Sequence, residues 1–157
     1  MNRYPARYKP KCSLPLLHGF CAIALAGSLA SSAGAADLTV NIDQIRKATG
    51  KVMLNVLQNE AQMAGTEAPY ASIMLPPKAS GVSFTLHGLT AGNWGVQVMH
   101  DENGNGELDS NLLGIPKEPW AFSNNATGKF GPPKWQDVQF EIDADDGSVD
   151  QTISLNH

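Results

Sequence analysis

The stretch Leu38-Thr39-Val40-Asn41-Ile42-Asp43 places an apolar side chain at every second position. Side chains of a β-strand point alternately to its two faces, so this period indicates a strand with one buried face. A short strand is also expected near residues 70–75. The sequence predicts an all-β domain: an antiparallel two-sheet sandwich of immunoglobulin or transthyretin type, with about seven strands and one long loop. The same alternation recurs at 52–56, 82–86, 94–98, 138–142 and 149–155.

The runs 82–86 and 94–98 flank a short loop that contains Gly88 and Gly92. We expect them to pair as a hairpin with their apolar residues on one face. His87 then points outward at one end of the hairpin, and His100 lies at the other end, so the two histidines are poor candidates for one metal site or one catalytic pair. The predicted core contains Val40, Leu54, Phe84, Val96, Val98 and Phe140.

Residues 1–36 have the character of a signal peptide. Four basic residues precede a mostly apolar stretch from Leu14 to Ala30, and Ala33-Gly34-Ala35 fits the small-residue cleavage pattern. The apolar stretch is shorter than the ~20 strongly apolar residues that a spanning helix needs. We therefore expect cleavage after Ala35 or Ala36, a periplasmic or secreted protein, and one domain at 37–157 without a membrane span.

The expected mature chain is acidic and has no cysteine. After Ala36 there are seven basic and fifteen acidic residues, a net charge of −8, and both Cys12 and Cys21 precede it. Such a domain repels nucleic acid and anionic lipid and attracts cations. Disulfide and thiol chemistry are excluded for the mature chain, whose ~120 residues suffice for one core without them.

The segment 101–109 has the spacing of a loop that wraps a hard cation. Side-chain oxygens occur at Asp101, Asn103, Asn105 and Asp109, and Glu107 can offer its backbone carbonyl. An EF-hand loop would end with glutamate at its twelfth position, where this chain has a leucine. The all-oxygen set favours calcium over zinc. The alternative is a solvated turn, because Asn-Gly pairs favour turns for local reasons.

Two further expectations concern this loop. Glu118 can replace the missing twelfth-position carboxylate if the chain folds back onto the loop. A loop carboxylate contributes little to a core, so we expect Asp101→Ala to leave the stability of the metal-free protein nearly unchanged.

About thirty residues separate the strand at 94–98 from a strand expected to start near Trp135. A structureless loop of this length is uncommon unless it is functional or tied down. It contains Trp120, Phe122 and Phe130, which either pack onto the sandwich with Trp135 or form an exposed platform for a sugar or peptide. Ser123-Asn124-Asn125 can bond to the backbone in either case.

The ordered series of motifs between His100 and Trp135 resembles an exported bacterial family, domain of unknown function 2141. The series comprises His-Asp-Glu-Asn-Gly-Asn-Gly-Glu-Leu-Asp, Leu-Gly-Ile-Pro-Lys-Glu-Pro, Ala-Phe-Ser-Asn-Asn-Ala and Phe-Gly-Pro-Pro-Lys-Trp. The resemblance covers most of the expected mature chain. It implies an exported β-sandwich of transthyretin or immunoglobulin type, with no established activity.

Two function classes remain open. The first is a non-enzymatic binding or structural module with a structural calcium ion, whose partner would be a cell-envelope protein or a glycan. The second is a metal-assisted periplasmic hydrolase that uses His100, Asp101 or Ser123. The chain has no Gly-x-Ser-x-Gly motif and no catalytic metal set, so the sequence favours the first class.

Overall fold

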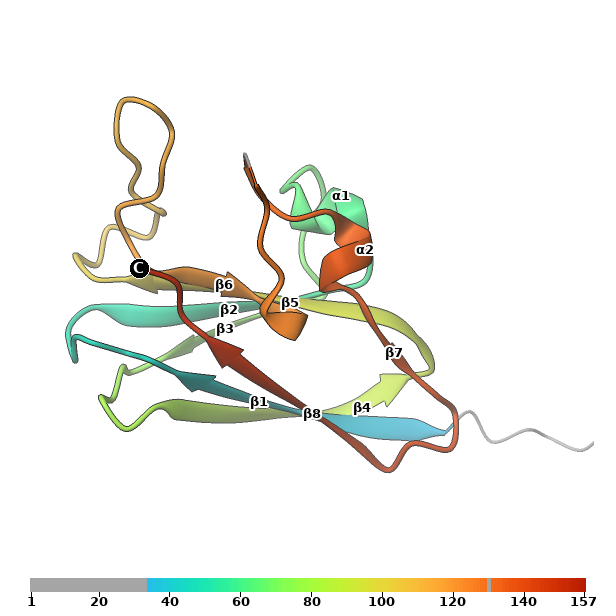
Figure 1. The fold of residues 1–157 in the computed structure, drawn as a ribbon. Helices are drawn as coiled ribbons and strands as arrows, with labels where there is room; N and C mark the ends of the chain where they lie inside the picture. The colour runs from blue at the N-terminus through green and yellow to red at the C-terminus, as the bar shows by residue number, and fades with distance from the viewer. Residues whose placement is uncertain (1–33, 130) are drawn as a thin grey trace, which may run out of the picture. The chain divides into compact units, whose positions relative to one another are not determined.

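The computed structural model describes residues 34–129 and 131–157, all of which belong to one compact unit, Ser32–His157. Most of the predicted signal peptide, both cysteines and Phe130 lie outside the described residues. Two β-sheets face each other across a common core (Figure 1). The sequence-based prediction of an all-β two-sheet sandwich is confirmed.

The smaller sheet has three strands in the order β4-β1-β8. The larger sheet has the order β3-β2-β5-β6, and β7 pairs with the first residues of β5. The strands are β1 (Ala35–Asp43), β2 (Lys51–Leu57), β3 (Ala71–Leu75), β4 (Val82–Thr90), β5 (Gly92–Asp101), β6 (Trp120–Phe122), β7 (Phe140–Ile142) and β8 (Ser148–Ser154).

Two features of the strand pairing differ from the prediction. The expected hairpin of β4 and β5 is wrong, because β4 pairs with β1 while β5 pairs with β2 in the opposite sheet. The chain crosses between sheets at Ala91, so the two apolar faces meet across the core instead of side by side. In addition, β8 runs parallel to β1, whereas the other pairs are antiparallel.

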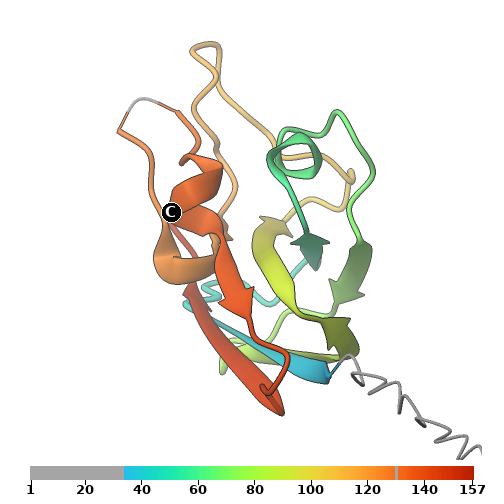
Figure 2. The same cartoon turned by 90° about the vertical axis from the view of Figure 1, so that its right-hand side faces the viewer.

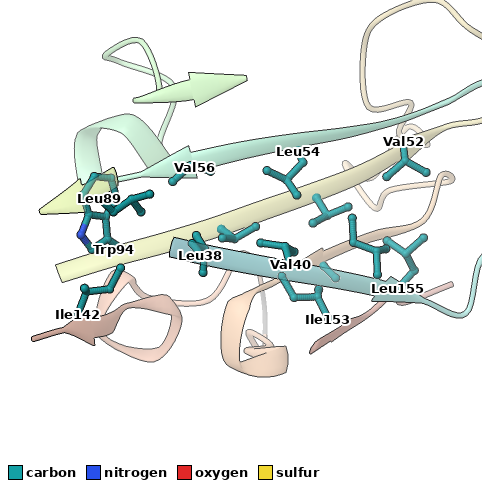
Figure 3. Packing of buried hydrophobic residues seen from close by; sticks show 14 of the residues in the cluster. Leu38, Val40, Val52, Leu54, Val56, Leu89, Trp94, Ile142, Ile153 and Leu155 are labelled. Carbon is teal, nitrogen blue, oxygen red and sulfur yellow. The ribbon is translucent and has the colours of Figure 1, made fainter. Parts of the chain in front are cut away.

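Alternate residues of the strands form the core. Figure 3 shows Leu89, Trp94 and Ile142 gathered at one end of the core, with β1 and β2 residues facing each other along it. Of the predicted core residues, Val40, Leu54, Val96 and Val98 are at most 1% exposed. Phe140 is partly buried and packs against this core. The prediction of Phe84 as a core residue is wrong, since this side chain is partly buried without being part of the core cluster.

A second apolar cluster lies on the outer face of the larger sheet. Figures 1 and 2 show the helices α1 (Glu60–Met63) and α2 (Trp135–Val138) on this side, away from β1, β4 and β8. The cluster contains Leu57, Phe122, Ala126, Trp135 and Val138.

The prediction of a strand from Trp135 is therefore wrong for its first four residues. Trp135 and Val138 are three positions apart, and a helical turn directs both toward the sheet. A glycine in β5 makes this packing possible: a Cβ at Gly95 would lie 2.7 Å from a ring carbon of Trp135. Val138 is in phase with Phe140, so alternation alone assigns it to the following strand.

Candidate functional site

The acidic loop, residues 101–109, begins at the last residue of β5. Asp101 is 1% exposed, and its carboxylate accepts three backbone N–H bonds. Oδ1 accepts from Gly104 at 2.6 Å and from Asn105 at 3.2 Å, and Oδ2 accepts from Gly106 at 2.9 Å. Glycine is suited to positions 104 and 106, because φ is +80° and +86° there. The backbone of residues 104–106 is thus held around the Asp101 carboxylate by hydrogen bonds.

These contacts govern the ionisation of Asp101. Burial of its carboxyl group raises the pKa, but the N–H bonds from Gly106, Gly104 and Asn105, together with the charge of Lys51, more than offset burial. The net effect holds the pKa of Asp101 below its ordinary value. The loop therefore keeps a buried negative charge at its start. Because this carboxylate orders the loop backbone, we now expect the loss of Asp101 to lower the stability of the metal-free protein, in place of the small effect expected from the sequence.

The other predicted side-chain ligands converge on Asp109. Asn103 donates from Nδ2 to Oδ2 of Asp109 at 2.7 Å, and Asn105 donates from Nδ2 to Oδ1 at 3.1 Å. The amide oxygens also bond locally: Asn103 Oδ1 accepts from the N–H of Asn105, and Asn105 Oδ1 accepts from that of Glu107. The alternate spacing in the sequence thus brings these side chains together, as predicted.

Glu118 closes the loop from outside. Its side chain is buried, and its two carboxylate oxygens accept the backbone N–H groups of Glu102 at 2.9 Å and Asp109 at 3.1 Å. The chain does fold back as expected, but Glu118 clamps the two ends of the loop through the backbone. Glu102 in turn forms an ion pair with Lys47, which ties the loop to the segment before β2.

The donor set fits a hard cation. Asp101, Asn103, Asn105 and Asp109 supply carboxylate and amide oxygens, and each of these oxygens except Asp101 Oδ1, which accepts two N–H bonds, has a second lone pair besides its present hydrogen bond. Within residues 34–129 and 131–157 no group of three or more His, Cys, Asp or Glu side chains is placed to hold a metal. The asparagine oxygens are therefore essential to any ion site here, and an ion would have to replace the two amide N–H bonds to Asp109.

Ser123 occupies a structural position. It is fully buried, and its hydroxyl donates to Val138 O at 2.6 Å and accepts from Val96 N at 2.9 Å. The hydroxyl therefore lies beside Val96, while His100 is four residues further along β5, about 13 Å at ~3.3 Å per residue. His100 is buried as well, and its Nε2 bonds to Thr49 O. Ser123 and His100 are therefore not assembled as a nucleophile and its base.

The expectation that Ser123-Asn124-Asn125 bond to the backbone is confirmed, and the structure adds the partners of Asn124 and Asn125. Both adopt left-handed backbone angles, with φ of +58° and +50°. The Nδ2 of Asn124 lies within hydrogen-bond distance of the carbonyls of residues 137, 138 and 139. Asn125 bonds to the edge of β8, donating to Thr152 O and accepting from Ser154 N. We name Ser123, Asn124 and Asn125 the staple, because they join β5, α2 and β8.

The aromatic residues of the long loop pack onto the sandwich. Phe122 and Trp135 are at most 8% exposed, and the partly buried Trp120 stacks edge to face on Phe122 with ring centroids 5.7 Å apart. For these residues the packing alternative holds, and the alternative of an exposed aromatic platform is wrong. In the part of the chain that the structure describes, no helix has the length and apolar character to cross a membrane.

Comparison with known proteins identifies the family. A family model described as an uncharacterised protein conserved in bacteria, domain of unknown function 2141, matches residues 40–150, from the middle of β1 into β8. Neither the curated proteins nor the solved structures include a match. The matched region spans both sheets, the acidic loop and the staple, and this chain belongs to that family of bacterial proteins.

Proposed function

We propose that this protein is an exported, non-enzymatic β-sandwich module that binds calcium in the acidic loop and acts as a binding or structural component outside the cytoplasm. The observation that supports calcium is the convergence of Asn103 and Asn105 on Asp109, in a loop that the buried Asp101 has already ordered. Ordering the loop in advance lowers the conformational cost of binding. The net charge of −8 after Ala36 also favours cations over anionic partners.

Calcium would supply positive charge beside the Asp109 carboxylate, on which the side chains of Asn103 and Asn105 converge. Binding would join the first half of the loop, which Asp101 holds, to Asp109, whose backbone Glu118 holds. The ion would therefore act as a brace for the loop. Because the set has only two carboxylates, we expect a dissociation constant of about 10⁻⁴ to 10⁻³ M, as in extracellular modules.

A calcium titration followed by backbone amide NMR tests this proposal. The amide signals of Gly104, Gly106 and Glu107 should shift in a saturable way, because their N–H groups bond to the proposed ligands. Signals from the acidic turn between β7 and β8, around Asp145, serve as a control for weak screening of charge. Equal shifts in the two regions, or no saturation at millimolar calcium, would refute calcium binding.

Export rests on the basic start, the apolar stretch and the sequence Ala33-Gly34-Ala35. The structure supports one of the two expected cleavage points. Ala36 is 1% exposed and pairs with Leu89 in β4, so cleavage after Ala35 keeps every buried residue of β1. Mass spectrometry of the protein from its native cells should find Ala36 as the first residue. A chain that retains Met1 would refute export.

A further inference from the structure

The loop between β5 and β6 has a second feature beyond the acidic loop. Residues 110–116, which we name the apolar finger, carry Leu112, Leu113 and Ile115 at relative exposures of 106%, 83% and 56%. Figures 1 and 2 show this amber segment standing clear of both sheets. Single exposed apolar residues are normal on a protein surface. Three within four positions at the tip of one projecting turn form a patch of the kind that marks an interaction site.

The finger is a defined turn held by its own hydrogen bonds. Ser110 and Pro116 face each other in an antiparallel bridge, and Asn111 N donates to Ile115 O at 2.8 Å. The side-chain oxygen of Asn111 accepts from the backbone N–H groups of Leu113 and Ile115 at 2.9 and 3.0 Å. An ordered turn loses little conformational entropy when its tip is buried against a partner, so the finger is suited to docking.

The charges around the finger indicate the kind of partner. Residues 101–118 contain five acidic residues and one basic residue, Lys117. Glu107 is exposed and Asp109 is partly buried, so negative charge lies next to the apolar tip. Attraction to anionic lipid requires a cluster of basic residues, whereas Lys117 is the single basic residue between 101 and 118. The apolar tip and its acidic base are complementary to an apolar pocket with a basic rim.

We propose that the apolar finger inserts Leu112, Leu113 and Ile115 into an apolar pocket, rimmed by Lys or Arg, on another protein. This inference deepens the proposed binding role and rests on it, but it does not require calcium, because Asn111 holds the turn. Burying one leucine side chain is worth about 10- to 100-fold in affinity. The acidic base contributes an attraction that salt weakens.

Photocrosslinking of the full chain in its native cells tests the inference. A diazirine amino acid is placed at Leu112 or Leu113, and at Met74 as a control, which is 60% exposed on β3. Both finger positions should give the same protein adduct, and Met74 should not. The captured protein, when purified, should bind the wild-type chain and lose about 10- to 100-fold in affinity for Leu113→Asp. Added salt, and separately the Glu107→Lys substitution, should each weaken the binding of the captured protein relative to the wild-type chain at low salt.

Several results would overturn the inference. These are an adduct no stronger than that of Met74, an adduct with lipid, an adduct with a second copy of this chain, or binding that Leu113→Asp leaves unchanged. The melting temperature of Leu113→Asp should equal that of the wild type, which separates lost docking from lost folding. Repeating the crosslinking with a calcium chelator distinguishes this inference from the calcium proposal: the adduct should persist even if the acidic loop binds no calcium.

Discussion

The acidic loop and the staple are both polar segments whose side chains bond mainly to backbone groups. They differ in where those groups lie. In the acidic loop, the side chains of Asp101, Asn103 and Asn105 form their hydrogen bonds within residues 101–109. Most of the backbone N–H groups that donate to them belong to exposed residues. In the staple, Ser123 bonds to the buried Val96 and Val138, and Asn125 reaches β8.

This difference separates a structural role from a binding role. Within the staple, Ser123 satisfies backbone groups that water cannot reach, so its loss leaves a buried group unpaired inside the protein. The acidic loop side chains satisfy groups that water can reach, and their oxygens keep free lone pairs on a surface segment. We therefore expect a large loss of stability on substitution of Ser123, and smaller losses together with a response to calcium in the acidic loop.

The largest effect is expected for Ser123→Ala. The substitution removes the side-chain partner of the buried Val96 N–H and the shorter of two bonds to Val138 C=O, and an unsatisfied buried group costs about 1–3 kcal/mol. We expect a loss of about 3 kcal/mol in the free energy of unfolding, measured by denaturant titration. Ser80→Ala, at an exposed position, is the matched control and should change it by less than about 0.5 kcal/mol. Similar values for the two variants would contradict a structural role for Ser123.

Two substitutions at Asn124 separate the stability contributed by its side-chain hydrogen bonds from the strain of its left-handed backbone. Asn124→Gly removes the side-chain bonds but tolerates φ of +58°, whereas Asn124→Ala also introduces left-handed strain. The strain costs about 1–2 kcal/mol, so alanine should be less stable than glycine by about 1 kcal/mol. Thermal unfolding of both variants measures the difference. If alanine were equal to glycine, the left-handed conformation would be wrong.

In the acidic loop, Asp101→Ala should reduce the metal-free stability by about 1.5 kcal/mol. It removes three hydrogen bonds to a charged group, but water can solvate the freed N–H groups of Gly104, Asn105 and Gly106. The effect should be smaller than that of Ser123→Ala in the same chelator-containing buffer. If Asp101→Ala lost as much stability as Ser123→Ala, access of water to the freed N–H groups would not distinguish the acidic loop from the staple.

The smallest effect is expected at the exposed pair of Asp37 and His87. The hydrogen bond from His87 Nδ1 at 2.8 Å is the main cause of the lowered pKa of Asp37. Because the pKa is lower in the folded state, the pair's contribution is present above the unfolded pKa of about 3.9 and disappears as the pH falls through the folded value. Unfolding between pH 5 and about 3 should depend slightly less on pH in Asp37→Asn. A steeper dependence in the variant would contradict this sign.

Alternation in the sequence was sufficient to predict most of the strands, because a half-buried strand shows its period locally. The three-residue β6 is too short to show a period, and it was assigned to the long loop. It could not predict which strands pair. The apolar faces of β4 and β5 alternate equally well whether the strands lie side by side or face each other across the core. Val138 was assigned to a strand for a similar reason, since its burial comes from the helical turn with Trp135.

The candidate site was predictable to the extent that its contacts are local. The spacing of the oxygen-bearing residues is enough to bring Asn103 and Asn105 to Asp109, and to place Asp101 against the backbone of the same loop. The clamp by Glu118 and the bonds of the staple join positions 9 to 29 residues apart, and nothing in the local pattern specifies those partners. The burial of Asp101 was also missed, because it depends on residues far away in the sequence. Asp101 pairs with Lys51, the first residue of β2, and a Cβ at the preceding Gly50 would overlap the carbonyl of Asp101.

The most direct test of the central claim is thermal unfolding across a calcium titration. The wild-type protein is compared with Asp109→Asn, which removes one ligand charge, and with Asp145→Asn, which removes a charge from the exposed turn between β7 and β8. At ten times the dissociation constant, calcium should stabilise the wild type and Asp145→Asn by about 1.4 kcal/mol, or about 5 °C. It should stabilise Asp109→Asn much less. If the wild type gains nothing in millimolar calcium, or Asp109→Asn gains as much, the acidic loop is a solvated turn and not a calcium site.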